Sequence, residues 1–242
     1  MPECQLTREY VLDVGQIDSR HIARPSAIVD FMQDISTRHA AVMGLSGEEF
    51  EKKYIWVLSR LKYTLTRPLN FYEKLRVTTI PRKLRGASWY RDFVFEADDG
   101  PVGSAVTVWA IVDLETRRLV RPQTIGMGFA EQQTGQTELL RALRAEQLEP
   151  CFDRVVRYSD IDVNCHLNNV KAVDILSDAF GLEADETRWV SQLQVNYITE
   201  TRCGTTLSIR RGVQDTDSDS LFVAAYDGEQ EKVQAEAVFS TR

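Results

Sequence analysis

Apolar side chains recur at helical spacing in two stretches of the chain, one in each half. The first stretch has the i, i+3, i+4, i+7 pattern of one helix face, formed by Ile28, Phe31, Met32 and Ile35. Pro25 suits the first turn of this helix, and Gly44 suits its end. The second stretch has a similar apolar face formed by Val173, Leu176 and Phe180, with Gly181 as its stop signal. The pattern therefore predicts two long helices.

Each predicted helix is followed by four segments with the alternation that is typical of strands. They cover residues 55–66, 75–80, 89–96 and 102–113 in the first half, and 189–199, 206–212, 221–226 and 233–239 in the second. Alternate residues of the first strand are predicted to share one face: Val57, Ser59, Leu61, Tyr63 and Leu65. An Asp-Gly pair precedes the last strand of each half, at 99–100 and 227–228, and predicts a hairpin turn there.

The two halves repeat one plan. Residues 9–14 resemble residues 153–158, and the same displacement brings Asp18 onto Asp162. We therefore predict an α+β protein with a tandem (double) hotdog fold, in which each of two long helices is wrapped by an antiparallel sheet and the sheets join edge to edge. The predicted division is an N-terminal hotdog at 1–120, a linker at 121–150 with a helix over 138–147, and a C-terminal hotdog at 151–242.

Composition and charge narrow the class of protein. The net charge of −7 argues against general nucleic-acid binding, which needs a basic surface. The cysteines have no paired spacing, so we expect neither disulfides nor structural zinc: Cys4, Cys151, Cys165 and Cys203. No apolar run approaches the ~20 residues of a membrane helix, and the first residues lack a secretory signal pattern. We expect a cytoplasmic protein without a membrane span.

The chemistry is concentrated just before the second helix. Asp162, Asn164 and His166 stand at alternate positions, and on an extended segment they would point the same way. The following helix start would offer free N–H donors. An amide, an imidazole and such donors can polarise a carbonyl. Enzymes of acyl transfer need groups of this kind. Asp162 could equally structure the loop, and Asn168 and Asn169 are more typical of helix N-caps.

The first half lacks this polar set. Arg20 and Ile22 occupy the positions of Asn164 and His166, while His21 is out of phase with them. A displacement that brings Leu61 onto Leu193 places Pro68 opposite Glu200. We therefore predict one site per chain, in the second half.

The segment Asp162–Lys171 closely resembles the D-x-N-x-H-x-N-N-x-K segment of acyl-acyl-carrier-protein thioesterases from plant plastids and bacteria. Residues 195–201 are similar to the strand of that family that ends in Glu-Cys, although Thr201 replaces the cysteine here. The resemblance implies that Glu200 is the general base that activates water. It implies that Asn164 and His166 position the water and the thioester carbonyl, and that Asp162 holds Asn164 or nearby backbone in place.

The resemblance also implies the reaction, which is hydrolysis of fatty acyl-acyl carrier protein to free fatty acid and carrier protein. Acyl carrier protein would be the partner, and no cofactor or metal is expected. The first half would line the acyl-chain pocket, and the second half would be catalytic. We expect Glu200 to be desolvated beside that pocket. An acyl-CoA thioesterase of the same fold, a non-catalytic acyl-binding or sensing module, and assembly into a homodimer stay open.

Overall fold

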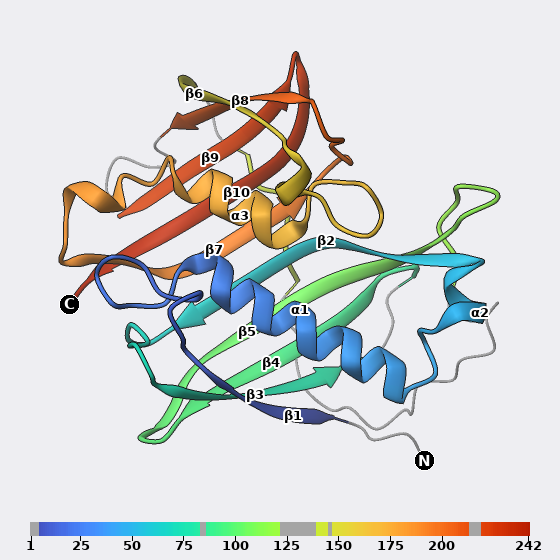
Figure 1. The fold of residues 1–242 in the computed structure, drawn as a ribbon, viewed down its shortest axis with the longest axis horizontal. Helices are drawn as coiled ribbons and strands as arrows, with labels where there is room; N and C mark the ends of the chain where they lie inside the picture. Colours follow the sequence, from blue (N-terminus) through green and yellow to red (C-terminus); the bar gives the residue numbers. More distant parts are fainter. Residues whose placement is uncertain (1–4, 83–85, 122–138, 145–146, 213–218) are drawn as a thin grey trace.

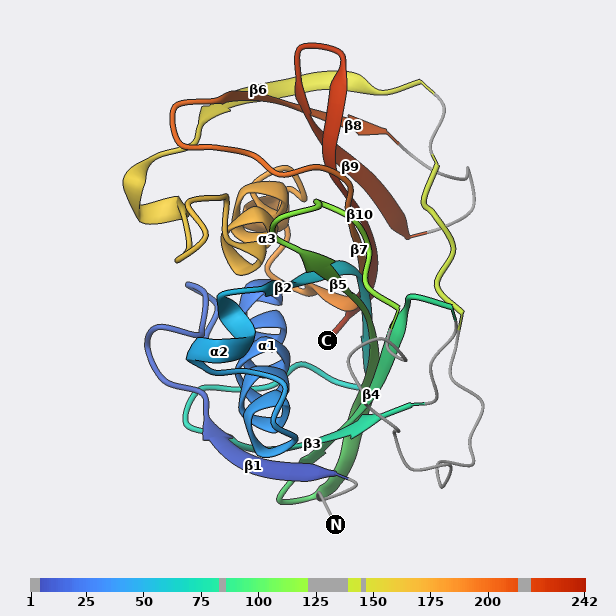
Figure 2. The ribbon, with the colours of Figure 1, turned by 90° about the vertical axis from the view of Figure 1, so that its right-hand side faces the viewer.

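The computed structural model describes residues 5–82, 86–121, 139–144, 147–212 and 219–242. In these residues one continuous antiparallel sheet curves round the helices, which lie on its concave side (Figures 1 and 2). The strands follow the order β1-β3-β4-β5-β2-β7-β10-β9-β8-β6. The first-half elements are β1 (Leu6–Val11), α1 (Pro25–Val42), α2 (Glu48–Glu51), β2 (Tyr54–Leu65), β3 (Lys74–Pro81), β4 (Trp89–Ala97) and β5 (Gly100–Asp113). The second-half elements are β6 (Glu149–Val155), α3 (Asn169–Ser177), β7 (Arg188–Tyr197), β8 (Thr206–Gly212), β9 (Ser220–Asp227) and β10 (Gln230–Thr241).

The strand order is the same in both halves when each is read from its outer edge inward. The sequence β1-β3-β4-β5-β2 corresponds to β6-β8-β9-β10-β7, and the innermost strands β2 and β7 pair antiparallel to join the halves. Each half-sheet curves round its own helix (Figure 2). This confirms the hotdog arrangement in both halves, the edge-to-edge junction and the two Asp-Gly hairpins.

The two main helices differ in length. α1 has 18 residues, begins with Pro25 and ends just before Gly44, whose φ is 72°. α3 has only nine residues, because its last turn tightens: the N–H of Phe180 donates to the carbonyl of Ser177, and Gly181 follows at φ 67°. Both glycine stops are confirmed, but the prediction of two long helices is not. In the described part of the chain no helix is long and apolar enough to cross a membrane.

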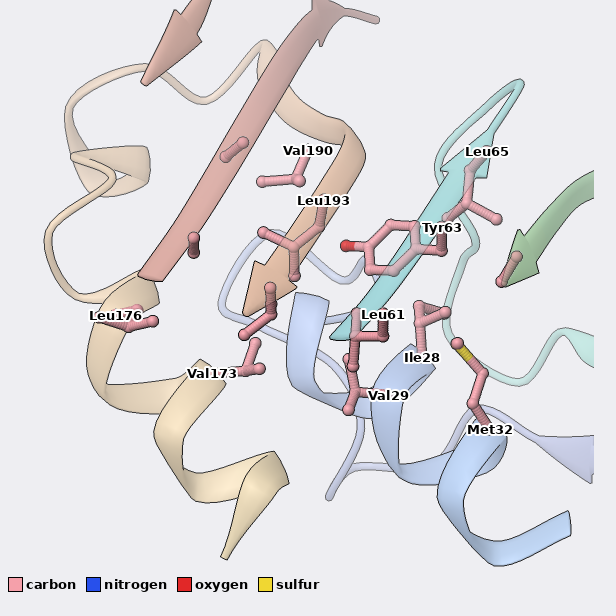
Figure 3. Close-up of a cluster of buried hydrophobic side chains, with 14 of the residues drawn as sticks. Ile28, Val29, Met32, Leu61, Tyr63, Leu65, Val173, Leu176, Val190 and Leu193 are labelled. Atoms are coloured by element: carbon pink, nitrogen blue, oxygen red, sulfur yellow. The ribbon is translucent and has the colours of Figure 1, made fainter. Parts of the chain in front are cut away.

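The core lies where the helices meet the central strands. Figure 3 shows inward side chains of β2 and β7, among them Leu61, Tyr63 and Leu193, packed against those of α1 and α3. The predicted alternation along β2 is confirmed from Leu61 onward. It is wrong before that residue, since a β-bulge between Leu58 and Arg60 inserts one residue and reverses the phase. Leu58, rather than Val57 or Ser59, is therefore buried against the core.

The segment between the halves forms neither helix nor strand over residues 139–144. Residues 139–144 are not helical, so the predicted linker helix is wrong there, and 138 and 145–146 lie outside the described residues. Leu140 packs on β5 of the first half, and Leu143 packs on β9 of the second. The carbonyl of Leu140 accepts from Arg60 Nη1 at 2.8 Å, and that of Arg141 accepts from Gln194 Nε2 at 2.8 Å. The segment therefore fastens both halves from outside the sheet.

Candidate active site

Residues 161–167, which we call the site loop, form a tight closed turn before α3. Its ends pair as an antiparallel bridge, and the N–H of Asp162 donates to the carbonyl of His166 at 2.8 Å. Cys165 adopts the left-handed conformation with φ 61°. The expected extended segment is therefore wrong, and the alternation of side chains along a strand does not apply here.

Asp162 structures the site loop. Its Oδ1 accepts from the N–H of Asn164 at 2.8 Å and from the N–H of His166 at 3.4 Å. Such a bond from an Asp side chain to the backbone two residues on mimics a backbone turn. Of the two interpretations left open by the sequence, loop support is the one that the hydrogen bonds display.

His166 and Glu200 are brought together from segments far apart in the chain. The N–H of Leu167 donates to the carbonyl of Thr201 at 2.7 Å, which places the site loop beside the segment after β7. His166 Nε2 then lies 3.2 Å from Glu200 Oε2. The His166 side chain is 20% exposed and that of Glu200 is 58% exposed, so the desolvated position expected for Glu200 is not found.

Lys232 of β10 holds the backbone of Glu200 through a hydrogen bond. Its side chain is only 9% exposed, and its Nζ donates to the carbonyl of Glu200 at 3.4 Å and to Gln230 Oε1 at 2.7 Å. No motif or spacing in the sequence singles out Lys232. Its neighbourhood with Glu200 arises only from the pairing of β10 with β7.

The start of α3 is partly closed by its own cap. Asn168 Oδ1 accepts from the N–H groups of Val170 at 2.8 Å and Lys171 at 3.4 Å, which confirms Asn168 as the N-cap. These two donors are therefore not free to bind a carbonyl. Asn169 has another role, since its Nδ2 donates to Gln33 Oε1 of α1 at 3.1 Å and links the two halves.

A cavity of about 570 Å³ opens beside the site loop. The site loop contributes Asp162, Val163 and Asn164, and α1 contributes Gln33, Ser36, Thr37 and Ala40. The remaining lining includes three charged residues, Glu51, Arg82 and Arg91, and six aromatic ones, Phe50, Tyr54, Trp56, Trp89, Tyr90 and Trp109. Two of the four predicted site residues thus line the cavity, and the other two form the imidazole–carboxylate contact.

Arg91 of β4 also lines this cavity and was missed by the sequence analysis. The sequence could have identified it, because Arg91 occupies an inward position in a strand whose other inward residues are apolar.

This arrangement can perform proton transfer next to a bound acyl group. A carboxylate can accept a proton from water, an imidazole can orient that carboxylate, and an amide can donate to a carbonyl oxygen. Among the described residues, no group of three or more His, Cys, Asp or Glu side chains could hold a metal ion.

Two domain models of one family match the chain and together cover most of it. The acyl-ACP thioesterase N-terminal domain matches residues 3–124, and the acyl-ACP thioesterase C-terminal domain matches residues 148–241. A chloroplastic palmitoyl-acyl carrier protein thioesterase of Gossypium hirsutum is 23% identical over 223 residues, which are 85% of this chain and 54% of that protein. The chain therefore spans about half the length of the curated relatives it matches.

Solved structures share the whole fold. An acyl-ACP thioesterase from Bacteroides thetaiotaomicron superposes with a TM-score of 0.87 at 23% identity over 98% of both chains. The 12:0-ACP thioesterase from Umbellularia californica superposes with a TM-score of 0.78 at 18% identity over 100% of this chain and 99% of the other. At these identities the likeness establishes the double hotdog architecture.

Proposed function

Since the chain belongs to the acyl-ACP thioesterase family, as the resemblance of residues 162–171 predicted, we propose that it hydrolyses fatty acyl-acyl carrier protein to free fatty acid and carrier protein. The observation that carries this proposal is the 3.2 Å contact between His166 Nε2 and Glu200 Oε2. It is formed by the loop from which Asn164 reaches the cavity. The names of the relatives, which are acyl carrier protein thioesterases, support the same reaction.

In the proposed mechanism Glu200 accepts a proton from a water molecule. The water oxygen bonds to the thioester carbonyl carbon, the carbon–sulfur bond breaks, and the leaving thiolate takes the proton from Glu200. Asn164 donates from its amide to the carbonyl oxygen and stabilises the charge that develops there. His166 holds the carboxylate in place through its 3.2 Å contact, and Asp162 holds the loop that carries both residues.

The two halves have different proposed tasks. Residues 1–120 would provide the acyl-chain pocket, which is supported by the large share of the cavity wall that α1, β2, β4 and β5 contribute. Residues 151–242 would be catalytic, with 121–150 as the linker. Each buried CH₂ contributes roughly 0.8 kcal/mol, so an acyl chain gains affinity from such a pocket.

Acyl carrier protein is the proposed partner, and its acidic surface requires positive charge near the cavity. Lys171 is the basic residue of the segment Asp162–Lys171, and its Nζ lies 3.2 Å from Asp174 Oδ2. A cytoplasmic location and a homodimer stay predictions.

The experiment is turnover by the purified chain on matched acyl-carrier and acyl-CoA thioesters, with released fatty acid measured by mass spectrometry. We expect faster release from the carrier thioesters, unchanged by EDTA, and release slowed by about 10²–10⁴-fold in a Glu200→Gln control. Faster turnover of the CoA thioesters would favour the acyl-CoA thioesterase. Tight acyl binding without release would favour the non-catalytic module. Activity lost with EDTA and restored by a divalent ion would contradict the metal-free reaction.

A further inference from the structure

Arg91 is a cation placed inside the wrapped sheet of the first half. The inward residues of β4 are Trp89, Arg91, Phe93 and Phe95, so Arg91 interrupts an apolar row. The residue is only 8% exposed. Burying a charge is costly unless the charge is paired, so the contacts of Arg91 need an explanation.

The contacts of Arg91 are with uncharged groups. Nη1 lies 2.9 Å from His39 Nδ1 and donates to Thr79 Oγ1 at 3.1 Å, and both partners are fully buried. A guanidinium can only donate, so Nδ1 of His39 must accept and the imidazole is neutral. Neither partner therefore compensates the positive charge.

The charge of Arg91 lacks a counter-ion in the described part of the chain. No carboxylate of those residues lies at ion-pair distance from it, and the N–H groups of Nε and Nη2 have no hydrogen-bond partner among them. Burial lowers the pKa of Arg91 to about 10, so the side chain is still a cation at neutral pH. A guanidinium edge with both nitrogens free matches the geometry of a carboxylate.

Arg91 and Asn164 line the same cavity. An acyl group whose carbonyl lies at Asn164 would therefore extend between the aromatic walls toward Arg91. A hydrocarbon end would gain from the contact with Trp56, Trp89 and Trp109, but it would leave the guanidinium unpaired.

We propose that this cavity accepts acyl groups that carry a carboxylate at the end far from the thioester, and that Nε and Nη2 of Arg91 bind that carboxylate side-on. The proposal rests on the proposed function and specifies its substrate class. Arg91 is then the residue that distinguishes carboxylate-ended from methyl-ended acyl groups.

The test uses two series of acyl-carrier thioesters of matched length, one with methyl ends and one with carboxylate ends. The measured quantity is the ratio of kcat/KM between the series, which does not depend on the folded fraction of a variant. Because a hydrogen bond to a charged group is worth a factor of about ten or more, the wild type should prefer the carboxylate end by at least about that factor. Arg91→Met should reverse the preference, and Arg91→Lys should keep part of it. Arg76→Met, at an exposed arginine of β3, is the matched control and should keep the wild-type ratio.

A wild-type ratio at or below one, or an unchanged ratio in Arg91→Met, would overturn the inference. Plain fatty acids are added as inhibitors in a separate arm. Inhibition that requires Arg91, without a preference for carboxylate-ended substrates, would assign the site to the product carboxylate and overturn the substrate class. If no carrier thioester is hydrolysed, the proposed function fails. Calorimetric binding of free dicarboxylates to wild type and Arg91→Met then decides the inference separately, since loss of binding in the variant supports it and equal binding contradicts it.

Discussion

The chain contains the same loop twice, once with and once without the proposed catalytic side chains. In residues 17–23, which we call the first-half loop, the N–H of Asp18 donates to the carbonyl of Ile22 at 2.8 Å. In the site loop the N–H of Asp162 donates to the carbonyl of His166, also at 2.8 Å. Both aspartates also accept from the backbone two residues on at 2.8 Å. The backbone conformation that the two loops share therefore forms with or without the proposed catalytic side chains.

Two residues after the shared aspartate, the first-half loop has Arg20 and the site loop has Asn164. Arg20 is 9% exposed, bonds Asp18 Oδ2 through Nη2 at 2.6 Å, and donates through Nη1 to the carbonyl of Arg188. It fastens the first-half loop to the start of β7. Asn164 instead lines the cavity, so the same backbone position fastens the loop in one half and faces a cavity in the other.

Four residues after the shared aspartate, the two loops again differ between a structural side chain and a proposed catalytic one. Ile22 is 3% exposed and packs in the core, whereas His166 meets the carboxylate of Glu200. Pro68 stands where Glu200 would be, so the first half has neither member of the imidazole–carboxylate pair.

The cavities beside the two loops differ both in size and in the side chains that line them. A groove of about 970 Å³ borders the first-half loop and is lined by many charged residues, among them Asp18, Arg20, Arg24, Asp174, Asp178, Glu183 and Arg242. The cavity beside the site loop is smaller, at about 570 Å³, and six aromatic side chains line it. The site is therefore identified by its side chains rather than by volume.

The largest effect is expected for Glu200→Gln. This change keeps the size of the side chain but removes the proton acceptor, so kcat should fall by about 10²–10⁴-fold. Binding of an acyl ligand should survive, because the cavity wall is intact. The check is single-turnover kinetics together with an equilibrium binding measurement. A variant that keeps turnover within a few-fold would show that another group activates water.

His166→Ala and His21→Ala form a matched pair across the two loops. His166→Ala should lower kcat by about 10²-fold or more, since a positioned catalytic group is lost. His21→Ala should leave kcat within a few-fold, because no described contact joins His21 to the proposed pair. Steady-state kinetics on both variants at equal thermal stability provides the comparison. Equal losses in the two variants would contradict a single site in the second half.

Asp162→Ala and Asp18→Ala test whether both loops contribute to stability while only the site loop contributes to turnover. Each change removes side-chain bonds to the backbone worth about 1 kcal/mol of unfolding free energy. Asp18→Ala should cost more than Asp162→Ala, because it also removes the ion pair with Arg20. Only Asp162→Ala should also lower kcat, by roughly tenfold, because it frees the backbone that carries Asn164 and His166. Denaturant unfolding and kinetics measure the two effects. The expectation fails if Asp18→Ala lowers kcat as much as Asp162→Ala.

The smallest effect is expected for Cys165→Ser and Cys203→Ser. Both cysteines are exposed, and direct attack by water needs no thiol, so most activity should remain in each variant. Intact-protein mass spectrometry of Glu200→Gln mixed with substrate is the sharper measurement. An acyl adduct on either cysteine would replace the water mechanism with a covalent one.

Local signals in the sequence were enough for most of the architecture. Pro25 and Gly44 mark the ends of α1, and the Asp-Gly pairs mark both hairpins, because these residues act within a single turn of backbone. Two of the errors fell where a distant partner decides. The bulge in β2 depends on its pairing with β5, and the non-helical segment 139–144 packs through Leu140 on β5 and through Leu143 on β9.

By itself the sequence determined the repeated plan, the segment Asp162–Lys171 and its family, since these are written in short stretches whose order is independent of folding. Only the tertiary structure decided how the site is built. Glu200 reaches His166 because the segment after β7 pairs with the site loop, and Arg91 reaches the cavity because β4 curves round α1. Contacts between residues far apart in the chain depend on strand order and sheet curvature, which no local pattern encodes.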